Sequence, residues 1–210
     1  MVPGNRRATT GRSLTHHWRV EPLTLADIRP PATYESVRAE ARRQVIELKQ
    51  ERRIAVGDQV TLVFENRDTV RGVVEEVLRA ERIEAPDRIA EEVETFNALI
   101  PGEGELTATL YLEITDPAEM MVRREELRGI DAAVTMRVDG VEVELLGDPG
   151  FAQEARTGSV HHLRFRLTPA QRDAFARGEV TINVDHPGYG AAITLTEAQR
   201  AALATDLTGG

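Results

Sequence analysis

Hydrophobic and polar residues alternate along several short stretches of the chain, which is the pattern of β-strands that are buried on one face. The alternating stretches are residues 60–64, 106–114, 134–138, 141–145, 160–167 and 180–186. In the stretch from Leu106 to Ile114 every second residue is apolar, which predicts one buried and one wet face. Asp139-Gly140 separates two of the stretches and predicts a tight hairpin turn between antiparallel strands.

Other stretches repeat apolar residues at every third or fourth position, which predicts amphipathic helices. We expect helices over residues 31–48, 66–78, 87–97, 116–129, 168–178 and 196–207. Asp116, Thr168 and Thr196 begin patterns that cap the first turn of a helix. The elements predict an α+β fold, with a largely antiparallel sheet of five or six strands and helices packed on one face. We expect a single α+β domain over residues 22–210, preceded by a flexible N-terminal extension at residues 1–21.

The composition excludes several classes of protein. The chain has no cysteine, which rules out disulfides, thiolate metal sites and a cysteine nucleophile. The net charge of −9 disfavours nucleic-acid binding, which needs a positive surface. No apolar run approaches the roughly 20 residues of a membrane span. Residues 1–20 contain arginines but no apolar stretch typical of a signal peptide, so we expect a cytoplasmic protein.

Two histidines lie on the apolar sides of two predicted strands. His161 alternates in phase with Leu163 and Phe165, and His186 alternates in phase with Val184. One histidine begins its strand and the other ends its strand, so both rings would reach the same edge of the core if the two strands paired antiparallel. Two histidines and one carboxylate would hold iron, manganese or zinc and leave positions open for a substrate.

Three acidic residues are candidates for the carboxylate of such a site. Glu65 ends the strand at 60–64 and is the preferred choice, although side-chain facing is least certain at a strand end. Glu113 belongs to the wet face of its strand. Asp185 should point away from His186 unless the strand has already broken before Pro187. The metal ligands are therefore predicted to be His161, His186 and Glu65.

Residues around the predicted site could bind a substrate or cofactor. We expect Arg67, Arg164 and Tyr189 at its rim, with Asp185 as a further cofactor-binding residue. Arg67 could instead form a buried ion pair with Glu65 beside a helix N-cap at Asn66 or Asp68. The histidines have alternatives as well. They could be hydrogen-bonded residues at the edge of the core, or they could act as general bases without a metal.

Several stretches of the chain together resemble an uncharacterised bacterial family, the domain of unknown function numbered 3501. The stretches that carry the resemblance are residues 22–28, 64–69, 99–101, 159–161, 163–165, 185–187 and Tyr189. The resemblance covers roughly residues 22–207. His162 departs from the family pattern, in which an aromatic residue is expected, and this favours His161 as the functional residue.

The resemblance implies a redox setting, because members of the family tend to be encoded near rubrerythrin-like and iron–sulfur proteins. The first hypothesis is therefore a metal- or ligand-binding site at the two histidines, in a metalloenzyme that uses non-haem iron or another divalent metal on a small-molecule substrate. The alternative is a non-catalytic adaptor that docks to a redox protein. The adaptor would need an exposed apolar patch and hydrogen-bonded, structural histidines. A homo-oligomer is compatible with both hypotheses.

Overall fold

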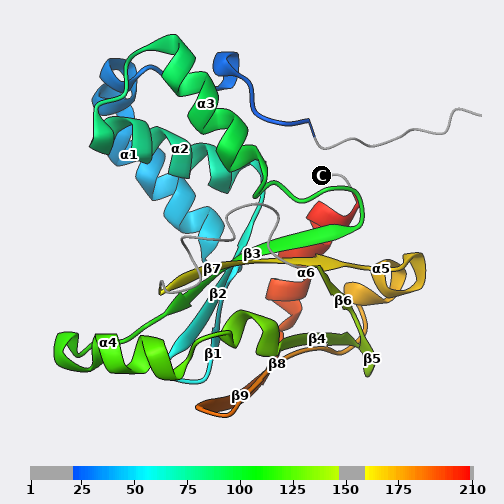
Figure 1. The fold of residues 1–210 in the computed structure, drawn as a ribbon. Coiled ribbons are helices and arrows are strands. Elements are labelled where there is room, and N and C mark those ends of the chain that lie inside the picture. Colours follow the sequence, from blue (N-terminus) through cyan, green and yellow to red (C-terminus); the bar gives the residue numbers. More distant parts are fainter. Residues whose placement is uncertain (1–20, 147–158, 209–210) are drawn as a thin grey trace, which may run out of the picture.

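The computed structural model describes residues 21–146 and 159–208 (Figure 1). The predicted flexible extension at residues 1–21 lies outside the described residues except for Glu21. Within the described ranges the chain forms two antiparallel sheets and six α-helices, together with two short 3-10 helices, Leu25–Asp27 and Ile130–Ala133.

The larger sheet has five antiparallel strands in the order β1-β2-β3-β7-β6. Its strands are β1 (Arg53–Val56), β2 (Val60–Glu65), β3 (Glu105–Leu112), β6 (Glu144–Leu146) and β7 (Val160–Arg166). The predicted α+β fold with a five-stranded antiparallel sheet is confirmed. β1 was not predicted, because it is short and begins with the exposed Arg53.

A second sheet, which the sequence did not predict, has four antiparallel strands in the order β5-β4-β8-β9. Its strands are β4 (Val134–Val138), β5 (Val141–Glu142), β8 (Val180–His186) and β9 (Tyr189–Thr194). The predicted hairpin turn is present between β4 and β5, where Asp139 and Gly140 both have positive φ. The chain then passes the buried Val143 and enters the other sheet as β6. The alternation of apolar residues identifies which face of a strand is buried, but not which strand lies beside it. The passage of the chain from the smaller sheet into the larger one could therefore not be predicted.

The two sheets bury their apolar faces in one common core. The larger sheet contributes Leu62, Phe64, Leu110 and Phe165, and the smaller one contributes Val134, Met136, Ile182 and Val184. Leu203 and Leu207 of α6 (Glu197–Leu207) belong to the same cluster, as does Phe175 of α5 (Pro169–Phe175). This core is apolar throughout because the alternation of the strands directs every second side chain into it.

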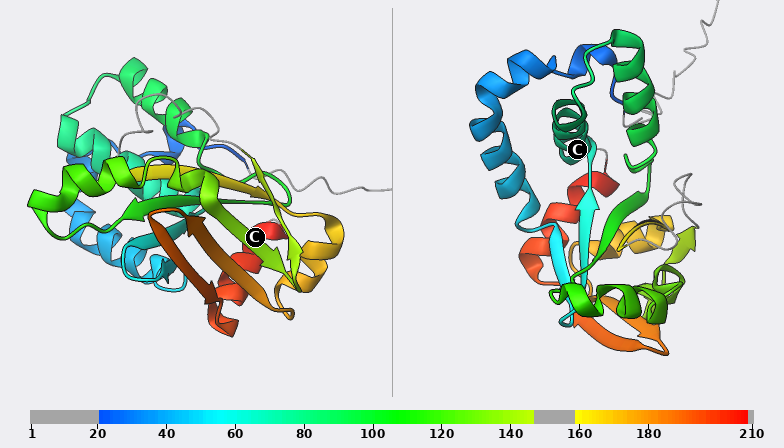
Figure 2. Two further views of the ribbon diagram at one scale, coloured as in Figure 1. Left: turned by 60° about the horizontal axis from the view of Figure 1, so that its bottom comes forward. Right: turned by 60° about the vertical axis from the view of Figure 1, so that its left-hand side comes forward.

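Three helices form a separate part of the molecule beyond one end of the larger sheet (Figures 1 and 2). They are α1 (Pro31–Lys49), α2 (Arg67–Glu81) and α3 (Pro86–Asn97). α2 and α3 enclose a second, smaller apolar cluster that includes Val70, Val74 and Val93. α4 (Pro117–Glu126) lies apart from them, at the other end of β3. No helix in the described ranges is long and apolar enough to cross a membrane.

Of the two residues predicted as the N-cap of α2, Asn66 and Asp68, it is Asn66 that caps the helix. Its side chain accepts hydrogen bonds from the backbone N–H groups of Asp68, at 3.1 Å, and of Thr69, at 3.0 Å. These contacts satisfy two amides that have no partner inside the helix. They therefore explain the polar residues at the junction of β2 and α2 as a structural cap.

Candidate functional site

The two predicted histidines do not lie on paired strands. β7, which carries His161, pairs with β3 and β6 in the larger sheet. β8, which carries His186, pairs with β4 and β9 in the smaller sheet. Antiparallel pairing of these two strands, the condition under which both rings would reach the same edge of the core, is therefore not met. Both strands bury one face in the same core, and this common burial gave them the same alternation.

His186 has a structural role at the turn between β8 and β9. The backbone N–H of Gly188 donates a hydrogen bond to its Nδ1, at 3.1 Å. Because Nδ1 accepts, the proton of the neutral ring is on Nε2, which donates to the carbonyl oxygen of Arg128 at 3.1 Å. Both ring nitrogens are thus engaged, and neither offers a lone pair to a metal in this geometry.

His161 is buried at the edge of the core, with 5% of its surface exposed. It lies opposite Leu110 in the register between β7 and β3. Its Nδ1 is 3.8 Å from Oδ1 of Asp131, in the short helix that precedes β4. Asp131 was not among the predicted carboxylates, because it lies outside every predicted strand and its position depends on the path of the chain after α4.

Glu65, the predicted third ligand, projects from the opposite face of the sheet. Glu65 lies opposite Thr107 on β3, whereas His161 lies opposite Leu110 on the same strand. Thr107 and Leu110 are an odd number of residues apart and therefore face opposite sides. The structure thus does not bring the three predicted ligands together. Within residues 21–146 and 159–208, no group of three or more histidine and carboxylate side chains is placed to hold a metal ion.

The two arginines predicted at the rim of the site have local partners. Arg67 pairs with Asp27 at 2.7 Å and donates to the carbonyl oxygen of Glu21 at 3.1 Å, so it does not form the predicted ion pair with Glu65. Arg164 forms an ion pair with Glu105 and also donates to a backbone carbonyl after α3. Arg164 therefore connects the sheet to the segment after α3, whereas Arg67 connects α2 to the segment before α1.

The remaining predicted residues lie on the β8–β9 hairpin. Asp185 is exposed and lies opposite Gly190. The Tyr189 hydroxyl donates to the carbonyl oxygen of Val56, at 2.6 Å, and accepts from the backbone N–H of Gln59, at 3.2 Å. Tyr189 therefore ties the smaller sheet to the β1–β2 hairpin of the larger one.

The face of the larger sheet that points away from the core has a buried polar cluster around Glu65. The carboxylate, 2% exposed, accepts a hydrogen bond on Oε1 from Thr109 at 2.9 Å, while its Oε2 is 3.8 Å from Nζ of Lys49. Burial raises the pKa of Tyr111 on the same face, and the negative charge of Glu65 raises it further. His162 is also on this face, with Nδ1 3.5 Å from the Thr109 hydroxyl. Glu65 therefore has the Thr109 hydroxyl as its hydrogen-bond donor and shares its face of the sheet with His162, not with His161.

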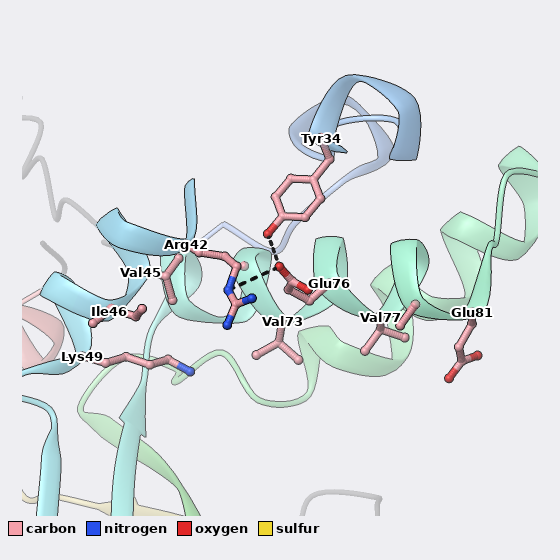
Figure 3. Close-up of a pocket in the computed structure, with 11 residues that line it drawn as sticks. Tyr34, Arg42, Val45, Ile46, Lys49, Val73, Glu76, Val77 and Glu81 are labelled. Atoms are coloured by element: carbon pink, nitrogen blue, oxygen red, sulfur yellow. Dashed lines mark hydrogen bonds and ion pairs between the residues drawn. The ribbon is translucent and has the colours of Figure 1, made fainter. Parts of the chain in front are cut away.

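An apolar groove lies between α1 and α2 (Figure 3). It has a volume of about 480 Å³, and its apolar lining comes from Val45, Ile46, Val73, Val77 and Ala80. Ile46 is 58% exposed, which is unusual for a large aliphatic residue beside other apolar side chains. Figure 3 shows Val45, Ile46 and Lys49 on α1 at one side, and Val73 and Val77 farther along on α2. The groove is therefore an open apolar surface bounded by two helices.

Gly72 explains why the two helices meet closely at one side of this groove. A Cβ atom at Gly72 would lie 2.8 Å from Cγ2 of Val45, a distance too short for real contacts. The missing side chain lets α1 approach α2 at that point. Beyond this contact, Val73 and Val77 are only half-buried and line the opening. One feature of the sequence indicates the groove: α2 has more apolar residues than the structure buries.

Charged residues surround the groove, and Glu76 is held by several of them. Glu76 accepts hydrogen bonds from the Tyr34 hydroxyl, at 2.8 Å, and from Arg38, at 2.9 and 3.1 Å. Burial acts to raise the pKa of Glu76, but the hydrogen bonds from Arg38 and Tyr34 outweigh it and hold the pKa below its ordinary value. Burial, followed by the hydrogen bond to Glu76, raises the pKa of Tyr34 to about 12. Arg42 approaches Glu76 only to 3.9 Å.

Comparisons with known proteins identify the family. Residues 22–207 match the family described as "Protein of unknown function (DUF3501)". The chain belongs to the DUF3501 family. Among solved structures, this DUF3501 protein is similar to a novel protein of unknown function from Burkholderia pseudomallei K96243, with 30% identity and a TM-score of 0.83. The similarity covers 89% of this chain and 100% of that chain. A search of curated proteins found no match.

Proposed function

We propose that this DUF3501 protein binds a small molecule in the groove between α1 and α2. The observation that carries the proposal is an open apolar groove of about 480 Å³ between two helices. Ligand pockets typically have volumes of about 300–1,000 Å³ and a mostly apolar lining with a few polar groups. Covering the groove would remove apolar surface from water, at about 25 cal/mol per Å². This gain supplies a driving force for binding that does not depend on a metal.

The groove supports a binding protein better than it supports a metalloenzyme at the histidines. His186 uses both ring nitrogens in hydrogen bonds, and Glu65 faces away from His161. The adaptor hypothesis requires an exposed apolar patch and structural histidines; the groove is such a patch, and the contacts of His186 fit the second requirement for that residue. Non-haem iron, a redox-protein partner, a homo-oligomer and a cytoplasmic location remain predictions from the sequence and its resemblance.

A neutral fluorescent probe tests the proposed groove. We expect N-phenyl-1-naphthylamine to bind the wild-type protein with enhanced fluorescence, and to bind Val77→Glu at least about tenfold more weakly, a loss of about 1.4 kcal/mol. Val77 lines the groove, and a carboxylate there would have to be desolvated by the probe.

The matched control is Val122→Glu on α4. Val122 is an equally small, exposed aliphatic residue that lies outside the groove, so this variant should bind the probe like the wild type. Thermal unfolding followed by circular dichroism would verify that both variants fold. Absence of probe binding by the wild type, or equal binding by all three proteins, would refute a ligand site in the groove.

A further inference from the structure

The chemistry at the edge of the groove specifies a class of ligand. Resting on the proposed function, we infer that the ligand has an anionic group, such as a carboxylate, attached to an apolar body, and that Arg42 and Lys49 bind that group. The two cations come from one helix and line the same groove as Val45, Val73 and Val77. A cationic end beside an apolar floor is the arrangement that such an amphiphile needs.

Arg42 has hydrogen-bonding capacity to offer a ligand. Its side chain is 53% exposed, and among the residues that the structure describes its ion pair with Glu76 spans 3.9 Å. Glu76 meanwhile accepts from Arg38 and Tyr34 at hydrogen-bonding distances. Because a guanidinium has five N–H donors in a planar fork, Arg42 can receive a carboxylate without displacing the contacts of Glu76.

Lys49 supplies the second positive charge from a partly buried position. Its side chain is 23% exposed, and Nζ lies 3.8 Å from Oε2 of the buried Glu65, beyond hydrogen-bonding distance. Oε2 accepts no hydrogen bond from the described part of the chain. Lys49 is therefore fixed between the sheet and the groove by charge attraction, with its three donors available for a closer acceptor.

The charges around the groove also orient the ligand. Figure 3 shows Lys49 and Glu81 at opposite ends of the groove, with Val73 and Val77 between them. An anion would be attracted to the end with Lys49 and Arg42 and repelled from the end with Glu81. The apolar body would then lie over Val73 and Val77. Because the overall charge of −9 disfavours anions, the inferred binding depends on this local pair of cations.

Three ligands with the same chain and different head groups test the inference. We would measure displacement of N-phenyl-1-naphthylamine by octanoate, 1-octanol and octylammonium. Octanoate should bind at least about tenfold more tightly than octanol, with octylammonium weakest. Arg42→Gln should reduce the preference, and Arg42→Gln combined with Lys49→Gln should abolish it. Arg88→Gln on α3, which removes an exposed arginine outside the groove, is the control and should keep it.

The outcomes separate this inference from the proposed function. If octanol binds as tightly as octanoate, the anionic ligand class is wrong although the groove still binds ligands. If the probe itself does not bind the groove, the proposed function fails. If the probe binds but no octyl compound displaces it, the inferred class is also wrong. Loss of Lys49 beside Glu65 could impair folding of the double variant. In that case the single variant Arg42→Gln still tests the inference.

Lys49 allows an independent test by NMR, because it is the only lysine in the chain. Reductive methylation with ¹³C-formaldehyde would give one side-chain signal from Lys49 and one from the terminal amine. Octanoate should shift the Lys49 signal and octanol should leave it in place. A Lys49 signal that does not respond to saturating octanoate would contradict its role in binding the anion.

Discussion

The region between the two sheets and the region formed by α1, α2 and α3 are stabilised in different ways. The sheets enclose a large apolar cluster that includes Phe64 and Phe165. In the helical region the apolar cluster is smaller, and ion pairs connect α1 and the segment before it to α2. Only Tyr34 and Ala41 of α1 are buried. The filled core between the sheets is therefore the structural scaffold. The pair formed by α1 and α2 is incompletely covered and has surface left for a ligand.

The largest expected effect comes from the filled core. Phe165→Ala should lower the free energy of unfolding by about 3–5 kcal/mol, because it removes a fully buried ring and leaves a cavity. Urea unfolding would measure the loss. Probe affinity, measured well below the unfolding transition, should remain that of the wild type. A change in probe affinity as large as that caused by Val77→Glu would show that the two regions are not separate.

A somewhat smaller loss is expected from the ion pair that connects the segment before α1 to α2. Both carboxylate oxygens of Glu75 accept from Arg29, at 2.7 and 2.8 Å, and the Glu75 side chain is fully buried. Glu75→Gln should therefore cost about 2–3 kcal/mol, because it weakens charged hydrogen bonds to a fully buried carboxylate whose partner, Arg29, is 36% exposed. Glu91→Gln, which removes an exposed partner of Arg88, should cost about 0–1 kcal/mol. Equal urea midpoints for the two variants would contradict the role of ion pairs in this region.

The close approach of α1 and α2 predicts a still smaller effect. Gly72→Ala should cost about 1 kcal/mol, because crowding against Val45 costs about 1–3 kcal/mol and the better helix propensity of alanine offsets about 1 kcal/mol. Combining Gly72→Ala with Val45→Ala should relieve the crowding. A double-mutant cycle in urea would measure this coupling. Strictly additive changes would mean that Gly72 does not set the separation of the helices.

The smallest effect is the pH dependence contributed by Glu76. Its pKa lies below the ordinary value of 4.5 in the folded protein, so the unfolded chain takes up this proton at a higher pH. Stabilisation by the ionised group is therefore fully present above pH 4.5 and is lost as the pH falls through the folded pKa. The difference in unfolding free energy between the wild type and Glu76→Gln should shrink over that range. A difference that stays constant from pH 7 to pH 3 would contradict the assignment.

The sequence predicted the fold better than the site, for a physical reason. Alternation over residues 106–114 and capping at Asn66 are local properties, and both correctly located elements of the structure. The predicted wet face of β3 was wrong, because Thr107 and Thr109 on that face are buried. Which strands become neighbours depends on contacts between distant parts of the chain, so the alternation around His161 and His186 could not show that they belong to different sheets.

The groove required information that no single stretch of sequence contains. It depends on how α1 crosses α2, and at the crossing Val45 comes so close to Gly72 that a Cβ atom there would lie 2.8 Å from Cγ2 of Val45. A glycine among the apolar residues on one face of a helix is a weak signal for close packing against another helix. Without the path of α1, the apolar residues Ile46 and Val73 were indistinguishable from residues of a buried core.

The most direct test of the account is a ¹H–¹⁵N correlation spectrum of the protein titrated with the neutral probe N-phenyl-1-naphthylamine. We predict that the largest shifts fall in residues 42–49 of α1 and 72–81 of α2, the segments that line the groove. Amides of β7 and β8 should remain unchanged. Shifts concentrated around His161 and His186, with α1 and α2 unaffected, would contradict the account and return the functional site to the histidines.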